Sequence, residues 1–387
     1  MQIGSSLLTP HHLFSKGGLQ AIIVSINYRL NVFGFLCAGG VDTNLGLYDQ
    51  RFAMEWTRDH CHLFGGNADN ITLGGLSAGA YSTQCQLIYD LLVSPKPMVR
   101  RAVMQSNAIP FQPKHPSLLQ SQFAELCALV LGDAASDETA ASRVERMRQV
   151  PADVLVQHLH KLPMFRPVVD EVFLPSNIMQ LLHGGDFGRR FVLAGMSLMI
   201  GEVENEESLY AKINPPQHPR ELVPSLCNYY PRKVVDSLVA MYPPLAESAD
   251  AEECERHFGR IVSDVQVRTS IRGFVQSLLL AHVPLSRIHR YRIGLRLQAA
   301  DQLTDPSYGV GHGDDSPIWW YHDGLSQEEE QHVRRWLTWM QRFLDGRELD
   351  WGCDSVDQYR LLDKGGERIQ TDASWDEFIK ISRMLRT

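Results

Sequence analysis

The chain has 387 residues, of which 44% are hydrophobic and 21% are charged, a composition typical of a soluble globular protein. Its formal net charge of −8 argues against nucleic acid as a partner, because nucleic-acid binding needs a basic surface. No apolar run approaches the roughly 18 residues that a membrane-crossing helix requires, so we expect no transmembrane segment.

The start of the chain and the cysteines bear on the compartment. The opening residues, MQIGSSLLTPHHLF, have no charged leader and no continuous apolar stretch, so the chain as written predicts no signal peptide and a cytoplasmic protein. The seven cysteines are scattered and form no C-x-x-C pair, which argues against a zinc or redox motif. They are expected to be buried thiols, although Cys227 and Cys254 could close a loop in a secreted protein. The localisation therefore stays open.

The first third of the chain alternates strand-like and helical segments. The run QAIIVSINY, residues 20–28, is continuously apolar and predicts a fully buried strand. Residues 44–60 follow with helical periodicity, and their predicted apolar face contains Tyr48, Phe52 and Trp56. A short β-branched run at 71–73 predicts the next strand.

Later segments continue the alternation. Residues 99–106 and 189–196 are predicted to be strands, and the segment RIHRYRIGLRL, residues 287–297, alternates strictly. Its arginines share one face, which must be either solvated or paired with acids: Arg290, Arg292 and Arg296. Near the end, Ser326 and Glu329 form a predicted capping box. It precedes a helix with the apolar stripe Val333, Trp336, Leu337, Met340 and Phe343.

Strands alternating with amphipathic helices predict an α/β fold with a mostly parallel sheet covered on both faces. No segment has the composition of a linker between independent domains. We therefore expect one α/β domain over residues 1–387, with helix-rich insertions around 111–185 and 215–280 that could cap the sheet.

A serine lies where the predicted strand at 71–73 gives way to helical sequence. The pattern Gly-Leu-Ser-Ala-Gly places Ser77 between Gly75 and Gly79, in the strand-to-helix setting of a nucleophile elbow. In so tight a turn, a side chain at either glycine is expected to clash and the serine to be strained. The helix that begins at Ala78 would supply a positive end where an oxyanion develops. The alternative is a small-residue turn with no chemistry.

A serine hydroxyl needs a base to react at neutral pH. Of the fifteen histidines, His312 is the best candidate, because the loop YGVGHGDDS surrounds it with glycines that could bring the imidazole over the serine. The following acids, Asp314 and Asp315, could merely cap the next turn. A metal site formed by these three residues is a weaker alternative, since no second histidine stands at ligand spacing.

A base in turn needs an acid that fixes its tautomer. An acidic cluster follows the predicted strand at 189–196 and contains Glu202, Glu204, Glu206 and Glu207. In α/β-hydrolases the acid comes between the serine and the histidine in chain order, after a later strand, and this cluster satisfies that order. A solvated acidic loop is the plainer interpretation of the same residues.

Six blocks of the chain, in order, resemble the type-B carboxylesterase family of cholinesterases and fungal esterases and lipases. They are VSINYRLNVFGFL, NLGLYDQRFAMEWTRDH, FGGNADNITLGGLSAGA, VMQSN, IGEVENEES and GVGHGDD, and the resemblance extends from residue 1 to about 345. It implies an α/β-hydrolase fold that cleaves a small-molecule carboxylic ester through an acyl-enzyme, without cofactor or metal. By position, Ser77 would be the nucleophile, His312 the base and Glu206 the acid, with the Ala78 N–H group in the oxyanion hole.

The chain also departs from the family pattern. Leu76, Asn107 and Glu207 replace a usual glutamate, glycine and glycine, respectively. Family members carry a His-Gly-Gly-Gly-type loop before a segment like FQIGSS, whereas this chain begins at MQIGSS. We therefore expect an N-terminally truncated fold without the strand between 20–28 and 70–74. Only Ala78 would then supply the oxyanion hole, and losing one donor costs about 10²–10³-fold in rate.

Two alternatives to an active esterase follow from these departures. One is a non-catalytic cholinesterase-like binding protein, and the other is an inactive truncated copy. Retention of Ser77, Glu206 and His312 favours the enzyme. The ester substrate and any protein partners stay open.

Overall fold

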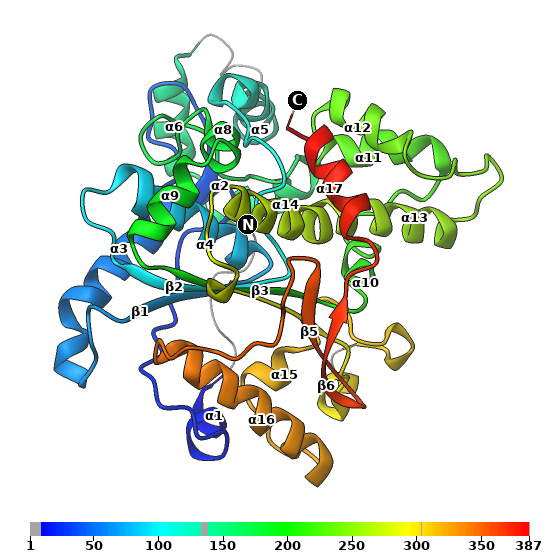
Figure 1. Ribbon diagram of the computed structural model, residues 1–387. Coiled ribbons are helices and arrows are strands. Elements are labelled where there is room, and N and C mark those ends of the chain that lie inside the picture. Colours follow the sequence, from blue (N-terminus) through cyan, green and yellow to red (C-terminus); the bar gives the residue numbers. More distant parts are fainter. Residues whose placement is uncertain (1–8, 133–137, 303, 387) are drawn as a thin grey trace. The chain divides into compact units, whose positions relative to one another are not determined.

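The computed structural model describes residues 9–132, 138–302 and 304–386 (Figure 1). The sequence predicts no strand in the first eight residues, and these lie outside the described residues. The described chain divides into two compact units. One comprises residues 25–55 and 112–178, and the other comprises 9–24, 56–111 and 179–386. Each is described by itself.

The second unit is built on a six-stranded sheet with the strand order β1-β2-β3-β4-β5-β6 (Figure 1). The first five strands are parallel, and β6 pairs antiparallel with β5. The strands are β1 (Ile71–Leu76), β2 (Val99–Gln105), β3 (Ser197–Val203), β4 (Ile288–Ile293), β5 (Gln358–Asp363) and β6 (Gly366–Thr371). This confirms the predicted mostly parallel sheet and the predicted strands at β1, β2 and β4. Because parallel strands end at one edge, the segments after β1 and β3 lie near each other.

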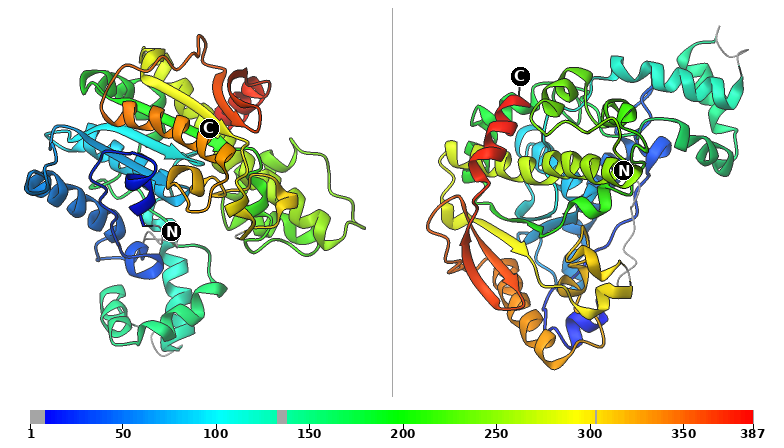
Figure 2. Two further views of the ribbon diagram at one scale, coloured as in Figure 1. Left: turned by 90° about the horizontal axis from the view of Figure 1, so that it is seen from below. Right: turned by 90° about the vertical axis from the view of Figure 1, so that its right-hand side faces the viewer.

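Helices cover both faces of this sheet (Figures 1 and 2). On one face are α1 (His11–Ser15), α15 (Ser316–Trp319) and α16 (Gln327–Leu344). They share a buried cluster with side chains of β2, β3 and β4. The capping box of Ser326 and Glu329 is confirmed at the start of α16. On the other face are α4 (Ala78–Ile88), α9 (Asp186–Leu193), α14 (Ser270–Leu280) and α17 (Trp375–Met384).

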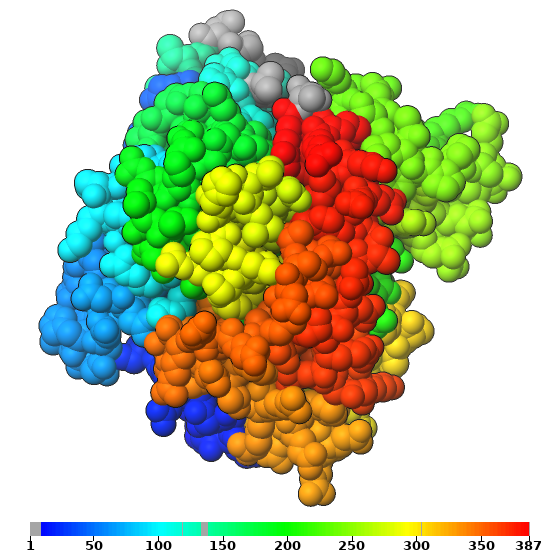
Figure 3. Space-filling model, in the orientation of Figure 1, coloured from blue at the N-terminus to red at the C-terminus, as the bar shows by residue number. Residues whose placement is uncertain are grey.

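The predicted insertion at 215–280 consists of helices that belong to the second unit. They follow α10 (Glu207–Tyr210) and comprise α11 (Leu222–Cys227), α12 (Arg232–Val239), α13 (Ala251–Ser263) and α14. A π-helical turn, Asp264–Thr269, joins α13 to α14. Figure 3 shows α17, in red, packed beside the yellow residues that follow α14. Buried polar side chains lie between α14 and the sheet, among them Arg272 of α14 and Glu202 of β3.

The first unit combines an early segment with most of the predicted insertion at 111–185. Its helices are α2 (Asn31–Phe35), most of α3 (Leu45–His60), α5 (Gln120–Leu131), α6 (Ala140–Arg148) and α7 (Ala152–His158), and α8 (Ile178–His183) begins at its end. The buried side chain of Asn44 joins the two segments. Its Nδ2 donates to the Val168 carbonyl at 2.8 Å, and its Oδ1 accepts from the Val168 N–H at 2.9 Å.

The predicted strand at 20–28 is wrong, because these residues have no regular structure. Two of its apolar side chains, Ile22 and Val24, are 45% and 44% exposed. A strand forms only where a neighbour satisfies its backbone groups. Here the Gln20 N–H donates instead to the side chain of Gln341 at 2.7 Å. Residues 20–28 therefore do not pair with β1, and among the described strands β1 has only β2 as a neighbour.

Two further predictions also fail. Residues 189–196 are not a strand, because α9 extends to Leu193 and the strand begins only at Ser197. Phe187 and Phe191 lie one helical turn apart and are fully buried, so the apolar residues here follow the helical period.

The predicted buried face of the helix at 44–60 is largely exposed. Phe52 and Trp56 are 76% and 51% exposed, whereas Leu47 and Met54 are buried. Polar Gln50 and Arg51 share the buried face. Periodicity identified the helix but not which side of it faces the protein.

All seven cysteines are free thiols, five of them buried, so Cys227 and Cys254 form no disulfide. Within the described ranges, no helix is both long and apolar enough to cross a bilayer.

Candidate active site

Ser77 forms the turn between β1, which ends at Leu76, and α4, which begins at Ala78. Its backbone has φ 57° and ψ −116°, a positive φ that non-glycine residues rarely adopt. Two hydrogen bonds hold it there. The Ser77 N–H donates to the Gln105 carbonyl at 2.8 Å, and the Tyr81 N–H donates to the Ser77 carbonyl at 3.0 Å. The strained conformation expected of an elbow is therefore present.

The two flanking glycines are not equivalent. A Cβ at Gly75 would lie 2.4 Å from the carbonyl carbon of Gly79, a separation that real Cβ atoms do not adopt. A Cβ at Gly79, by contrast, would meet nothing within 4 Å. The expected clash is confirmed at Gly75 and wrong at Gly79, because the missing side chain of Gly79 would point into open space. The close approach of strand and helix depends on Gly75.

Glu206 lies in the segment after β3 and is fully buried. Its Oε1 accepts a hydrogen bond from the Val203 N–H at 2.8 Å, and its Oε2 lies 2.5 Å from Nδ1 of His312. The predicted hydrogen bond between Glu206 and His312 is therefore confirmed. The neighbouring Glu204 is exposed, and Glu202 binds arginines elsewhere. Of these glutamates, Glu206 is the one whose carboxylate binds His312.

The imidazole of His312 is buried against Glu206 and Tyr210. Its side chain is 3% exposed, and its ring packs edge-on against Tyr210, with the ring centroids 5.4 Å apart. A Cβ at Gly313 would lie 3.5 Å from the Leu76 side chain, so the histidine loop passes beside the residue that precedes Ser77. Nε2 of His312 is buried and has no hydrogen-bond partner among the described residues. The nitrogen that a base would use is thus unoccupied.

The two acids after His312 bind different partners. Asp314 pairs with Arg296 at 2.9 Å, and Asp315 accepts a hydrogen bond from Nε1 of Trp319 at 2.7 Å. Burial raises the pKa of Asp315 to about 6; the Glu206 carboxylate adds to this shift, and the Trp319 hydrogen bond opposes it. Among the described residues, no group of three His, Cys, Asp or Glu side chains is placed to hold a metal ion.

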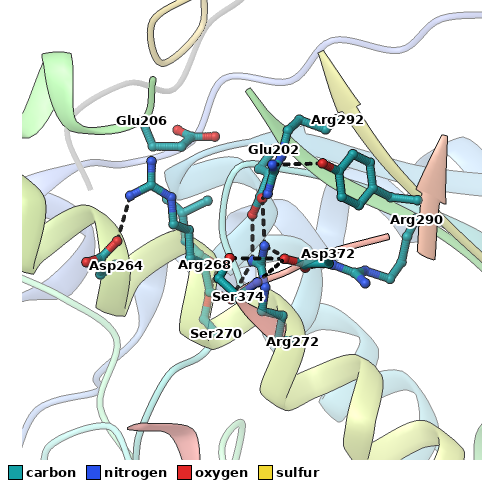
Figure 4. A network of polar contacts seen from close by, with 12 residues as sticks. Glu202, Glu206, Asp264, Arg268, Ser270, Arg272, Arg290, Arg292, Asp372 and Ser374 are labelled. Atoms are coloured by element: carbon teal, nitrogen blue, oxygen red, sulfur yellow. Dashed lines mark hydrogen bonds and ion pairs between the residues drawn. The ribbon is translucent and has the colours of Figure 1, made fainter. Parts of the chain in front are cut away.

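A network of buried charged side chains lies close to Glu206 (Figure 4). Glu202 accepts hydrogen bonds from Arg272 at 2.8 and 2.9 Å and from Nε of Arg292 at 3.0 Å. Asp372 binds Arg272 at 2.8 Å and Arg290 at 2.7 Å. The arginine face of the segment at 287–297 is therefore paired with acids, one of the two predicted outcomes. Burial alone would raise the pKa of Glu202, but Arg272 and Arg292 hold it well below its usual range.

Arg268 extends this network toward the candidate triad. Its guanidinium donates to Asp264 at 2.6 Å and is drawn beside Glu206 in Figure 4. Burial would lower the pKa of Arg268, but the charges of nearby acids, Glu206 among them, raise it. The buried carboxylate of Glu206 thus has a positive charge in its surroundings.

Sequence analysis missed Asn205, which joins the acid segment to the histidine loop. Its N–H donates to the Val310 carbonyl and its Nδ2 to the Tyr308 carbonyl, both at 2.9 Å. It also forms an isolated parallel bridge with Gly311. In the sequence, only its position directly before Glu206 points to a role for Asn205, because an asparagine in a loop belongs to no periodic pattern.

A parallel sheet with a serine at a strand-to-helix turn, and a Glu–His pair beyond later strands, defines an α/β-hydrolase. The family model described as the carboxylesterase family matches residues 1–345. An "uncharacterized esterase/lipase" of Schizosaccharomyces pombe is 36% identical over 406 residues, covering 100% of this chain and 75% of that protein. A "carboxylic ester hydrolase" of Gibberella moniliformis is 33% identical over 417 residues, with the same coverage. The acetylcholinesterase of Electrophorus electricus is 32% identical over 190 residues, 46% of this chain and 29% of that protein.

The chain therefore belongs to the carboxylesterase family. The resemblance seen in the six sequence blocks is confirmed, and with it the α/β-hydrolase fold.

Proposed function

We propose that the chain hydrolyses small-molecule carboxylic esters, with Ser77 as nucleophile, His312 as base and Glu206 as the acid that orients the base. The observation that carries this proposal is the buried 2.5 Å contact between Glu206 and Nδ1 of His312, which leaves Nε2 without a partner among the described residues. A carboxylate on Nδ1 fixes the proton there, so Nε2 is free to accept one. Family membership and the esterase and lipase relatives support the same chemistry.

The reaction follows from these roles. Nε2 of His312 takes the Ser77 hydroxyl proton while Oγ forms a bond to the acyl carbon. The bond to the alcohol oxygen then breaks, and the same proton passes from Nε2 to the departing alcohol. Water, deprotonated in turn by His312, attacks the acyl-enzyme. The bond from the acyl carbon to Ser77 Oγ then breaks, the proton passes from Nε2 to Oγ, and the carboxylic acid leaves.

Two groups stabilise charge during these steps. Glu206 faces the imidazolium that forms when His312 is protonated. The Ala78 N–H lies at the start of α4, directly after the nucleophile, where it would donate a hydrogen bond to the developing oxyanion.

Labelling with a fluorophosphonate probe tests the proposal, because the probe reacts only with an activated serine. We expect the wild-type chain to be labelled at Ser77 and the Ser77→Ala variant to lose all labelling. Glu206→Gln should label about 10³–10⁴-fold more slowly, since an amide no longer fixes the tautomer. Ser82→Ala, a serine farther along α4, serves as the matched control and should label like wild type.

Absence of labelling in a sample with folded circular dichroism would contradict the hydrolase and favour the binding protein. Absence in an unfolded sample would favour the inactive copy. Equal labelling of wild type and Ser77→Ala would show that another serine reacts, which would overturn the assignment of Ser77.

A further inference from the structure

We infer that the ion pair between Arg296 and Asp314 is a clamp that fixes the histidine loop, residues 309–315, in the position from which His312 can act. Both are positioning residues, since neither touches the reacting atoms. The inference rests on the proposed function, because it assigns the clamp to the same site. It goes beyond that function in naming which charges outside the triad keep the base in place.

Asp314 closes the loop around His312. Its own N–H donates to the Gly311 carbonyl at 3.0 Å, and its Oδ2 accepts the Gly311 N–H at 2.9 Å. The backbone just before His312 is therefore tied to the backbone and to the carboxylate of the residue two positions after it. That carboxylate is 3% exposed, so its hydrogen bonds have little competition from water.

Arg296 joins both ends of the loop to the segment that follows β4. Its Nη1 donates to the Gly309 carbonyl at 2.5 Å, before His312, and to Oδ2 of Asp314 at 2.9 Å, after it. Thr304 completes the arrangement, since its hydroxyl donates to the same Asp314 oxygen at 2.7 Å and its carbonyl accepts from Arg296 at 2.7 Å. One guanidinium thus bridges the start and the end of the loop, and the planar fork of arginine suits this use.

The loop cannot easily move against its neighbour. A Cβ at Gly311 would lie 2.5 Å from Oγ of Ser208 and 2.9 Å from Oδ2 of Asp314. The bridge between Asn205 and Gly311 holds the same point on the side of Glu206. The clamp therefore keeps the histidine loop packed against the segment that contains Glu206. Without the clamp, we expect His312 to be less well aligned with Glu206.

The test compares fluorophosphonate labelling rates at pH 8 for Arg296→Gln, Asp314→Asn and the double variant. We expect each single variant to label about 10–100-fold more slowly, because a shift of about 1 Å in a catalytic group costs rates of this order. The double variant should slow labelling by less than the product of the two single effects, since both changes remove the same ion pair. Arg296→Lys keeps the charge and should recover part of the rate.

A buried ion pair of similar exposure elsewhere in the second unit provides the matched control. Glu367 accepts from Arg360 at 2.9 Å, and their side chains are 1% and 10% exposed. Glu367→Gln should lower the unfolding temperature as much as Asp314→Asn does, but leave the labelling rate of the folded protein unchanged. Hydrogen–deuterium exchange of the peptide covering 309–315 gives a readout independent of activity, and it should become faster only in the clamp variants.

The outcomes separate the clamp from the function. A labelled wild type with clamp variants that label equally fast overturns the clamp and leaves the proposed function standing. Equal slowing by Glu367→Gln also overturns it, because the effect would then be general destabilisation. An unlabelled wild type would overturn the proposed function and, with it, the catalytic role of the clamp. Unchanged hydrogen–deuterium exchange at 309–315 in the clamp variants would show that the clamp does not order the loop.

Discussion

Asp315 illustrates at the scale of one residue how burial sets a protonation state. The residue is 1% exposed, its carboxyl group accepts a hydrogen bond from the indole N–H of Trp319, and it lies near Glu206 and His312. Burial raises its pKa to about 6, from about 3.8 in the unfolded chain. The folded state therefore binds more protons between these two values, and this carboxyl stabilises the fold less as pH rises through that window.

We expect Asp315→Asn to remove this pH dependence, because the amide is neutral at every pH and can still accept from Trp319. At pH 8 the variant should be more stable than wild type by up to about 3 kcal/mol, the value of a shift of about two pKa units. Near pH 4 the two should differ little. Urea unfolding at pH 4, 6 and 8 measures the difference, and a gain of the same size at all three values would contradict the explanation.

At the scale of elements, the turn between β1 and α4 stores strain in Ser77. The residue keeps a positive φ because the strand, the helix and the hydrogen bond to Gln105 determine its backbone. Strain of this kind costs about 1–3 kcal/mol and is retained where a site requires it. Gly75 permits the turn, whereas the strain itself lies at the serine.

Replacing Ser77 should show this cost directly. Ser77→Ala and Ser77→Gly both remove the hydroxyl, but only glycine adopts a positive φ without strain. Ser77→Gly should be more stable than Ser77→Ala by about 1 kcal/mol, since the relief is partly offset by the greater freedom of glycine in the unfolded chain. Thermal unfolding of the two variants measures this difference, and a Ser77→Ala variant more stable than Ser77→Gly would show that the turn is unstrained.

At the scale of the whole second unit, a network of charges joins elements far apart in sequence. Glu202 at the end of β3 binds Arg272 of α14 and Arg292 of β4, and Asp372 follows β6. Arg272 is fully buried, so its positive charge relies on these carboxylates for compensation. A buried pair contributes little net stability, but breaking it leaves a charge without compensation.

Glu202→Gln should therefore lower the free energy of unfolding by about 3–5 kcal/mol. The exposed pair of Arg232 and Asp236 gives a control, and Asp236→Asn should change stability by less than about 1 kcal/mol. Urea unfolding at pH 7 checks both. A loss below about 1 kcal/mol in Glu202→Gln would show that water or another group compensates Arg272.

Features that depend on local patterns can be predicted from the sequence. Strand and helix periods predicted β1, β2, β4 and α16, and the ordered blocks identified the family and predicted Ser77, Glu206 and His312 as its site. These features are readable because a strand-to-helix glycine motif or a capping box acts over only a few residues.

The remaining features depend on how distant segments of the chain pack together. Residues 20–28 look like a buried strand, but a strand needs a neighbouring ladder, and none of the described strands supplies one. The exposed Phe52 and Trp56 show likewise that periodicity defines a face but not what covers it. The ion pair of Arg296 and Asp314 spans 18 positions of the chain, and Asn205 binds Tyr308 across 103 positions. Such contacts follow from how the strands assemble, and no local pattern encodes them.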